Sequence, residues 1–225
     1  MMKNAVIFDV DGTLVDSVDL HARAWSEAFH QFGYDVTPAQ ARTQIGKGGD
    51  ELLPVFLPPA DLARIGDALK EWRGQHFRDN YLGEVRGFPG VRTLFEALLA
   101  QGTRIGLGTS AQSAELTELK QAAGIADLDL GEVSSKDANR SKPHPDIFQV
   151  ALQRLDATPA ETIVVGDSPY DAEAASKAGM QSIGLLCGGF PKDDLDRAGF
   201  IALFRDPADL LQNLRSTQLV RPPKP

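Results

Sequence analysis

Short apolar runs, most of them rich in β-branched residues and bounded by glycine or aspartate, recur along the chain. They lie at Ala5–Val10, Arg104–Gly108, Thr162–Gly166, Ser182–Leu186 and Phe200–Phe204. Their length and apolar character predict strands that are buried on both faces of a sheet.

Amphipathic helical patterns lie between most of these runs. Apolar residues recur with the i, i+3 and i+4 spacing of one helix face within residues 91–99, 116–123 and 147–155. Strands that alternate with helices form a parallel sheet that is covered on both faces. The predicted fold class is therefore α/β, with a Rossmann-like parallel sheet as its core.

The segment 17–85 breaks this alternation, because it contains no convincing strand and at least two helical stripes, within residues 20–32 and 62–76. We expect an all-α domain inserted after the first strand. Residues 1–16 and 86–225 then form the α/β core domain. The chain crosses between the two domains twice, which predicts a hinge.

The composition of the chain limits which classes of binding partner and which cellular compartment are expected. The chain of 225 residues has 23 Lys and Arg against 31 Asp and Glu, a formal net charge of −8. With no basic block, this charge argues against nucleic acid and anionic membrane as partners. Cys187 is the only cysteine and cannot form an internal disulfide. Because the first apolar run is too short for a signal peptide or a membrane-spanning segment, we expect a cytoplasmic protein. Because the sequence shows no coiled-coil pattern, we expect a monomer.

Candidate chemistry begins at the end of the first predicted strand, where Asp9 and Asp11 precede Gly12 and Thr13. Ligand sites in open α/β sheets lie at this edge. Carboxylates this close repel one another and stay ionised only beside a cation or hydrogen-bond donors, which favours a Mg²⁺ ion. A simple Asp-Gly turn with solvated acids is the alternative.

Three further polar signals follow later elements of the predicted fold. Thr109 and Ser110 end the second core strand, Lys142 precedes a proline, and Asp167 and Asp171 follow the strand at Thr162–Gly166. The carboxyl ends of parallel strands meet at one edge of a sheet, so these side chains are expected to converge. A hydroxyl, an ammonium and two pairs of acids match the needs of phosphoryl transfer.

These four motifs, in this order, resemble the haloacid dehalogenase superfamily. Its phosphatases show the pattern DxDGT, then a Ser or Thr at a strand end, then Lys, then GDxxxD. The resemblance covers nearly the whole chain, since the helical insert is similar to the helical cap of that family. It implies a Mg²⁺-dependent phosphatase that acts on a small phosphorylated metabolite through an aspartyl-phosphate.

The resemblance also implies a role for each motif residue. Asp9 would attack phosphorus, and Asp11 would act as general acid and then as base while its backbone carbonyl binds Mg²⁺. Thr109 and the Ser110 amide would bind phosphoryl oxygens, and Lys142 would neutralise charge.

The last motif completes the implied metal site. Asp167 would be the remaining protein ligand to Mg²⁺. Asp171 would bind a metal-bound water or hold Lys142, and an acid that merely stabilises a helix N-terminus is the alternative for it. Because Asp11 is available to protonate an oxygen leaving group, phosphate ester chemistry is favoured over dehalogenation.

Specificity in such proteins is expected from the cap, whose loop corresponds here to residues 45–52. Lys47 in this loop is a candidate contact for the leaving group, or is simply solvated. His21 is a candidate to orient Asp11 or a substrate hydroxyl, or is a structural residue. Phosphoglycolate phosphatases and β-phosphoglucomutases share this cap. The mutase pattern carries an arginine in the loop, and Lys47–Leu52 has none, so a phosphatase is favoured over a mutase.

Two other functions remain open on sequence grounds. Residues 106–111 fit the G-x-G-x-x-A fingerprint of dinucleotide-binding proteins, but the fingerprint normally occupies the first βα turn, which here is the acidic motif. A phosphate-accepting receiver domain also clusters Asp, a hydroxyl and Lys, although it lacks a helical insert and has its acceptor on a later strand. Both are weaker predictions than a phosphatase.

Overall fold

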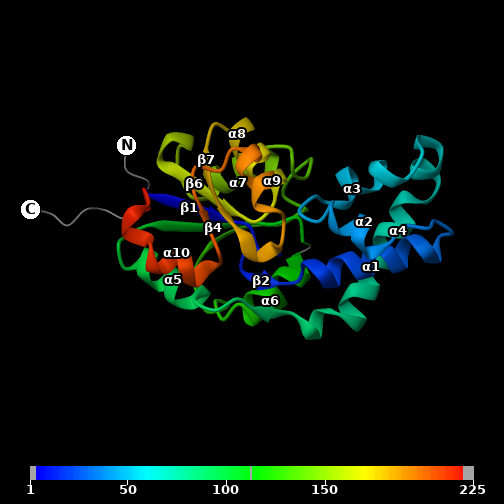
Figure 1. The fold of residues 1–225 in the computed structure, drawn as a ribbon, viewed down its shortest axis with the longest axis horizontal. Helices are drawn as coiled ribbons and strands as arrows, with labels where there is room; N and C mark the ends of the chain where they lie inside the picture. Colours follow the sequence, from blue (N-terminus) through cyan, green and yellow to red (C-terminus); the bar gives the residue numbers. More distant parts are fainter. Residues whose placement is uncertain (1–3, 112, 220–225) are drawn as a thin grey trace, which may run out of the picture.

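Six strands of the described chain form one parallel sheet, with the order β5-β4-β1-β6-β7-β8 (Figure 1). This computed structural model describes residues 4–111 and 113–219. The strands are β1 (Ala5–Phe8), β4 (Arg104–Gly108), β5 (Gly131–Val133), β6 (Thr162–Gly166), β7 (Gln181–Leu185) and β8 (Leu203–Phe204). The predicted α/β class with a parallel sheet is confirmed.

Helices cover both faces of this sheet (Figure 1). On one side lie α5 (Val91–Leu99), α6 (Ser113–Ala122) and α10 (Pro207–Gln212), and on the other α7 (Asp146–Arg154), α8 (Pro169–Lys177) and α9 (Lys192–Ala198). Strand β1 shows why the sheet is apolar throughout: Val6 and Phe8 pack with α5, while Ala5 and Ile7 pack with α7. A strand buried on both faces has no polar alternation.

The predicted strands agree with the structure except at their ends and at one edge. The last predicted run, 200–204, pairs only over Leu203–Phe204, and the three-residue edge strand β5 was not predicted. The described residues also form four short 3₁₀ helices: η1 (Leu82–Glu84), η2 (Pro159–Glu161), η3 (Leu186–Gly188) and η4 (Leu214–Ser216).

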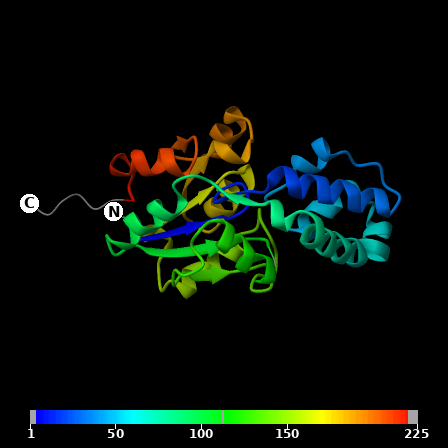
Figure 2. The same ribbon diagram turned by 90° about the horizontal axis from the view of Figure 1, so that it is seen from below.

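The segment after the first strand folds into four helices, which we call the helical region. They are α1 (Val18–Gln31), α2 (Pro38–Arg42), α3 (Gly49–Phe56) and α4 (Pro59–Asn80). These helices share an apolar cluster of their own, drawn from residues 18–72. Figure 2 shows the helical region to one side of the sheet, beyond the carboxyl end of β1. None of the helices in the described part of the chain has the length and apolar character needed to cross a membrane.

The two crossings between the sheet and the helical region pair with each other. Strand β2 (Val15–Asp16) runs antiparallel to β3 (Arg86–Gly87), with Val15 opposite Gly87 and Asp16 opposite Arg86. The chain therefore leaves for the helical region and returns from it at one hydrogen-bonded point, close to the end of β1.

The apolar cluster of the helical region generates a stability prediction on helix α3. Leu53 is fully buried in the cluster, whereas Val55 on the same helix is 50% exposed. We expect Leu53→Ala to lower the free energy of unfolding by about 2–5 kcal/mol, because it leaves a cavity. The matched change Val55→Ala is expected to alter it by less than about 0.5 kcal/mol. Urea denaturation measures both, and equal losses would contradict the assignment of the cluster as a core.

Candidate active site

A tight turn carries the chain from β1 into the site. The backbone N–H of Asp9 donates to the Val165 carbonyl at 2.9 Å, so Asp9 continues the pairing of β1 with β6. Gly12 then takes a φ of +80°, and a Cβ there would collide with the Asp167 carboxylate. Only glycine fits this position, because both the backbone conformation and the space exclude a side chain. The turn leaves the carboxylate of Asp9 at the carboxyl edge of the sheet.

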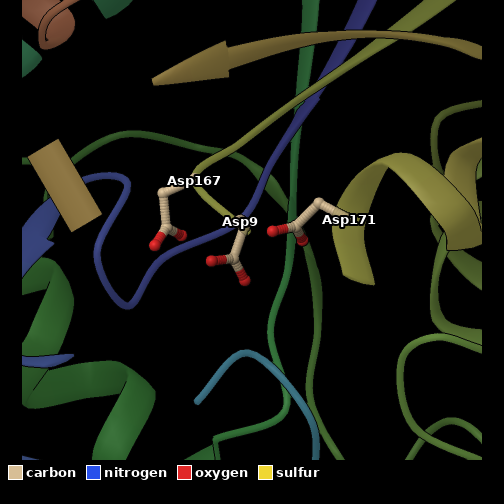
Figure 3. Close-up of side chains that lie close together, drawn as sticks. All are labelled: Asp9, Asp167 and Asp171. Carbon is tan, nitrogen blue, oxygen red and sulfur yellow. The ribbon is translucent and has the colours of Figure 1, made fainter. Parts of the chain in front are cut away.

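Three buried carboxylates meet at this edge (Figure 3). Asp9 lies between Asp167, which follows β6, and Asp171, which lies in the first turn of α8. Each offers an oxygen, and these oxygens lie within 4.8 Å of one another. Exposed fractions of 2%, 2% and 0% place all three away from bulk water. The convergence follows from the sheet order, because β1 and β6 are neighbours.

Lys142 is the positive charge inside this cluster. Its ammonium donates to Asp9 Oδ1 and, at 2.9 Å, to Asp171 Oδ1. The side chain is 1% exposed. Burial lowers the pKa of Lys142, but the charges of Asp171 and Asp9 outweigh burial and raise it above its usual value. The lysine is therefore a fixed cation.

One lysine does not balance three carboxylates. Burial raises the pKa of Asp9 to about 7, although Lys142 opposes it, and burial with the charge of Asp9 raises the pKa of Asp167 well above its usual value. The Thr13 hydroxyl donates to Asp167 Oδ1 at 3.0 Å. Clustered carboxylate oxygens with excess negative charge fit a hard divalent cation.

Asp171 uses its two oxygens for two tasks. Its Oδ2 accepts from the hydroxyl and the backbone N–H of Ser168, at 2.6 and 3.1 Å, and forms a capping box at the start of α8. Its Oδ1 accepts from Lys142. Of the three roles that the sequence left open, the contacts show two, a helix N-terminal acid and a partner of Lys142, and binding of a metal-bound water stays a prediction.

Asp11 faces away from this cluster, toward the helical region. Its Oδ1 accepts from Ser17 Oγ at 2.7 Å and lies 2.8 Å from His21 Nε2. The other ring nitrogen of His21 meets the Arg73 guanidinium. Arginine can only donate, so Nδ1 accepts and Nε2 carries the proton toward Asp11. Burial raises the pKa of Asp11, but His21, Ser17 and Arg73 outweigh burial and lower it to about 2.

Arg73 on α4 is a site residue that was not predicted from the sequence. The guanidinium carbon lies 5.0 Å from the centre of the Trp25 ring and 5.1 Å from that of Phe77, and its Nε is covered without a hydrogen-bond partner. A signal was available: Arg73 is four residues after Leu69 and four before Phe77, both fully buried, so it occupies the inward face of α4. The arginine therefore comes from α4 and not from the loop 47–52.

A second missed residue is Glu115 on α6, which is 2% exposed and accepts from Arg78 at 3.4 Å. It is a core-facing acid within an amphipathic helix, a position that normally holds an apolar residue. Its carboxylate also helps to keep the Arg73 guanidinium charged, because it raises the pKa that burial lowers.

Seven of the nine predicted site residues line one cavity of about 70 Å³ between the helical region and the sheet. They are Asp9, Asp11, His21, Lys47, Thr109, Ser110 and Lys142. The other two, Asp167 and Asp171, lie beside Asp9. A second cavity of about 290 Å³ adjoins the first and shares Trp25, Arg73, Ser110 and Glu115 with it.

The hydroxyls and Lys47 take different positions around this cavity. Thr109 Oγ1 accepts from the Ala111 amide at 3.0 Å, while Ser110 Oγ is covered and has no hydrogen-bond partner. Lys47 Nζ donates to Gln44 Oε1 at 2.7 Å and lies 4.7 Å from the centre of the Tyr170 ring. Lys47 therefore reaches the rim of the cavity, held by groups outside it.

Comparison with known proteins agrees with this geometry. Residues 6–185 match the family described as haloacid dehalogenase-like hydrolase. A protein of Dickeya dadantii named probable phosphatase IndB is 33% identical over 204 residues, covering 88% of this chain and 87% of its own length. The phosphoglycolate phosphatase of Escherichia coli is 31% identical, with 93% and 91% covered.

A solved structure gives the same result for the fold. The crystal structure of a hydrolase from Pseudomonas syringae superposes with a TM-score of 0.85 at 29% identity, covering 95% of this chain and 98% of that one. The expectation of a phosphatase-type enzyme from this superfamily is thus confirmed. On the matched motifs, the relatives and the shared fold, the chain belongs to the haloacid dehalogenase-like hydrolase family.

Proposed function

We propose that this enzyme hydrolyses small phosphate monoesters with Mg²⁺, through a phosphorylated Asp9. The observation that carries the proposal is the division of labour between the two acids of the first motif. Asp9 lies beside Lys142 and other acids, where the carboxyl ends of β1 and β6 meet. Asp11 is held by His21 and Ser17 on the side of the helical region, where the leaving group of the substrate would lie. A nucleophile and a proton carrier thus lie two positions apart in the sequence.

In the first step, a carboxylate oxygen of Asp9 attacks phosphorus and the bond from phosphorus to the ester oxygen breaks. Asp11 gives its proton to the departing oxygen. In the second step, water attacks the phosphorus of the aspartyl-phosphate, Asp11 takes a proton from that water, and inorganic phosphate leaves. Asp9 returns as a carboxylate, so the enzyme is regenerated.

The low pKa of Asp11 keeps its carboxyl group ionised, so that it can accept a proton in the second step. For the first step it must carry a proton, and the negative charge of a bound phosphoryl group raises the pKa of a neighbouring carboxyl. His21 keeps Asp11 in place throughout, through the hydrogen bond of 2.8 Å. Lys142 and the Thr109 hydroxyl are positioned to bind phosphoryl oxygens.

The groups that would hold Mg²⁺ are the side chains of Asp9 and Asp167 and the backbone carbonyl of Asp11. Asp171 lies close enough to hold a metal-bound water and also fixes Lys142. When bound, the ion supplies positive charge that offsets the charge of the phosphoryl group.

The helical region, residues 17–85, is proposed as the cap that covers this site, and residues 1–16 and 86–225 as the core domain. Arg73 reaches the cavity from the helical region and brings a positive charge to the leaving-group side. A substrate with a second anionic group would pair with the Arg73 guanidinium through that group. Examples are the carboxylate of phosphoglycolate and the carboxylate of an acidic sugar phosphate. We propose that the enzyme acts on such metabolites as a cytoplasmic monomer.

Arg73 also keeps a second function open, a sugar phosphate mutase of the β-phosphoglucomutase type. The absence of an arginine from Lys47–Leu52 argued against a mutase, but Arg73 supplies a guanidinium to the same cavity from α4. A mutase would return the phosphoryl group to its product and release little inorganic phosphate. Product analysis with a hexose phosphate distinguishes the two reactions.

The nucleophile is tested by Asp9→Asn. We expect the rate of phosphate release to fall by about 10³-fold or more, since the Asn amide cannot form the aspartyl-phosphate. The melting temperature should hold, because the Asn amide oxygen can still accept from Lys142, whose charge stays paired with Asp171. Asp16→Asn, the same change at an exposed position nearby, is the control and should retain activity. An active Asp9→Asn enzyme would contradict the assignment.

The metal is tested on a panel of phosphorylated acids, sugar phosphates and nucleotides, with Mg²⁺ or with a chelator. We expect hydrolysis to stop with the chelator and to return when Mg²⁺ is added. Asp167→Asn should raise the Mg²⁺ concentration needed for half-maximal rate by about tenfold or more, because it removes a charged ligand. The exposed change Asp193→Asn should leave that concentration unaltered. Full activity in the chelator would refute the metal site.

The role of Arg73 is tested by substrate comparison. Arg73→Ala should lower kcat/KM for phosphoglycolate by about 10- to 100-fold, the worth of a hydrogen bond to a charged group. For p-nitrophenyl phosphate, which has no second anion, the loss should be smaller. Arg78→Ala is the matched control, because Arg78 also contacts Glu115 but does not line the cavity. Equal losses on both esters would rule out an anion contact.

A further inference from the structure

The loop that carries Lys142 is held by the start of helix α3, and this contact joins the helical region to the sheet. Ser141, next to Lys142, is 8% exposed. Its backbone N–H donates to Asp50 Oδ2 at 3.0 Å, and its hydroxyl donates to Asp50 Oδ1. The Gly48 N–H donates to Ser141 Oγ at 3.0 Å. The backbone N–H and the hydroxyl of Ser141 are thus fixed from the helical region.

A neighbouring residue of α3 holds the same loop at two more points. Glu51 Oε1 lies 3.2 Å from the Arg140 guanidinium and 3.1 Å from His144 Nε2. Residues 140, 141 and 144 therefore all meet α3, and Lys142 lies between them. We call this set, Gly48, Asp50, Glu51, Arg140, Ser141 and His144, the lysine-loop contact.

Local geometry shows that the contact is not a by-product of helix capping. Gly48, the N-cap of α3, contributes no side-chain cap, and Asp50 directs its carboxylate to Ser141. Gly48 has a φ of −79°, which any residue adopts. What excludes a side chain is Ser141, whose Oγ and Cβ would lie 2.5 and 2.6 Å from an added Cβ. The glycine allows the close approach of the two regions.

We propose that Asp50 is a positioning residue for Lys142. Asp50 fixes Ser141, and this contact places the lysine ammonium against Asp9 only when α3 is in contact with the loop. The inference rests on the proposed function. Lys142 must meet Asp9 and Asp171 at once, and a displacement of its backbone of about 1 Å is enough to cost rate at a reacting centre. Asp50 itself never reaches the substrate phosphorus in this scheme. Catalytic competence is thereby linked to the docking of the helical region.

The test compares Asp50→Ala, Asp50→Asn and Ser141→Ala with Asp67→Ala, which removes a fully exposed acid of the helical region. With p-nitrophenyl phosphate and saturating Mg²⁺, we expect Asp50→Ala to lower kcat by about 10- to 100-fold with a smaller change in KM. Asp50→Asn should recover most of the loss, since its amide oxygen still accepts from the Ser141 N–H. Asp67→Ala should match the wild-type enzyme.

A double-mutant cycle separates positioning from general destabilisation. If Asp50 acts through Ser141, the double variant Asp50→Ala with Ser141→Ala should be no slower than the slower single variant. Multiplied losses would overturn the proposal, as would a kcat for Asp50→Ala equal to that of Asp67→Ala.

Small-angle X-ray scattering provides a readout that needs no catalysis. Gly48→Ala introduces the excluded side chain, so this variant and Asp50→Ala should both have a larger radius of gyration than the wild-type protein. An unchanged radius would overturn the proposed docking. If the wild-type enzyme hydrolyses no ester, the proposed function fails, while the scattering result still decides whether the contact holds the two regions together.

Discussion

The pairing of the buried Lys142 ammonium with Asp9 and Asp171 is the interaction on which the rest of the site depends. Breaking a buried ion pair leaves an uncompensated charge, which costs several kcal/mol, so each partner constrains where the other can lie. Here the partners come from three separate elements: the turn after β1, the loop before α7, and the first turn of α8. The sheet brings these elements together because β1 and β6 are neighbours.

Helix capping and site chemistry share one side chain at this point. The carboxylate of Asp171 completes the start of α8 with Ser168 and also accepts from Lys142. A group with both tasks has little freedom to move, since a rotation that improves one contact weakens the other. The result is a rigid cation between two acids, which is the preorganised electrostatic environment that phosphoryl transfer requires.

Much of this arrangement could be predicted from the sequence, because its main parts are determined by short stretches of neighbouring residues. The turn at Gly12, the strand before Asp9 and the strand before Asp167 are each encoded within a few residues, and the parallel topology then brings them together. The helical pattern of α4 indicates that Arg73 faces inward, but not that it meets His21, because that approach depends on how α4 packs on α1. The lysine-loop contact is equally non-local, since it joins residues that lie 89 to 93 positions apart. The edge strand β5 was not predicted, because its three residues are too few to show the hydrophobic pattern of a strand.

The paired crossings β2 and β3 have a consequence for how the two regions relate to each other. Since the exit and the return of the chain are hydrogen-bonded neighbours, the 69 positions between Asp16 and Arg86 form a loop whose ends are already closed. The entropy of closing such a loop grows only slowly with its length. The entropy of loop closure therefore sets little constraint on how many residues lie between β2 and β3. The length of the helical region can change without a large change in the stability of the sheet.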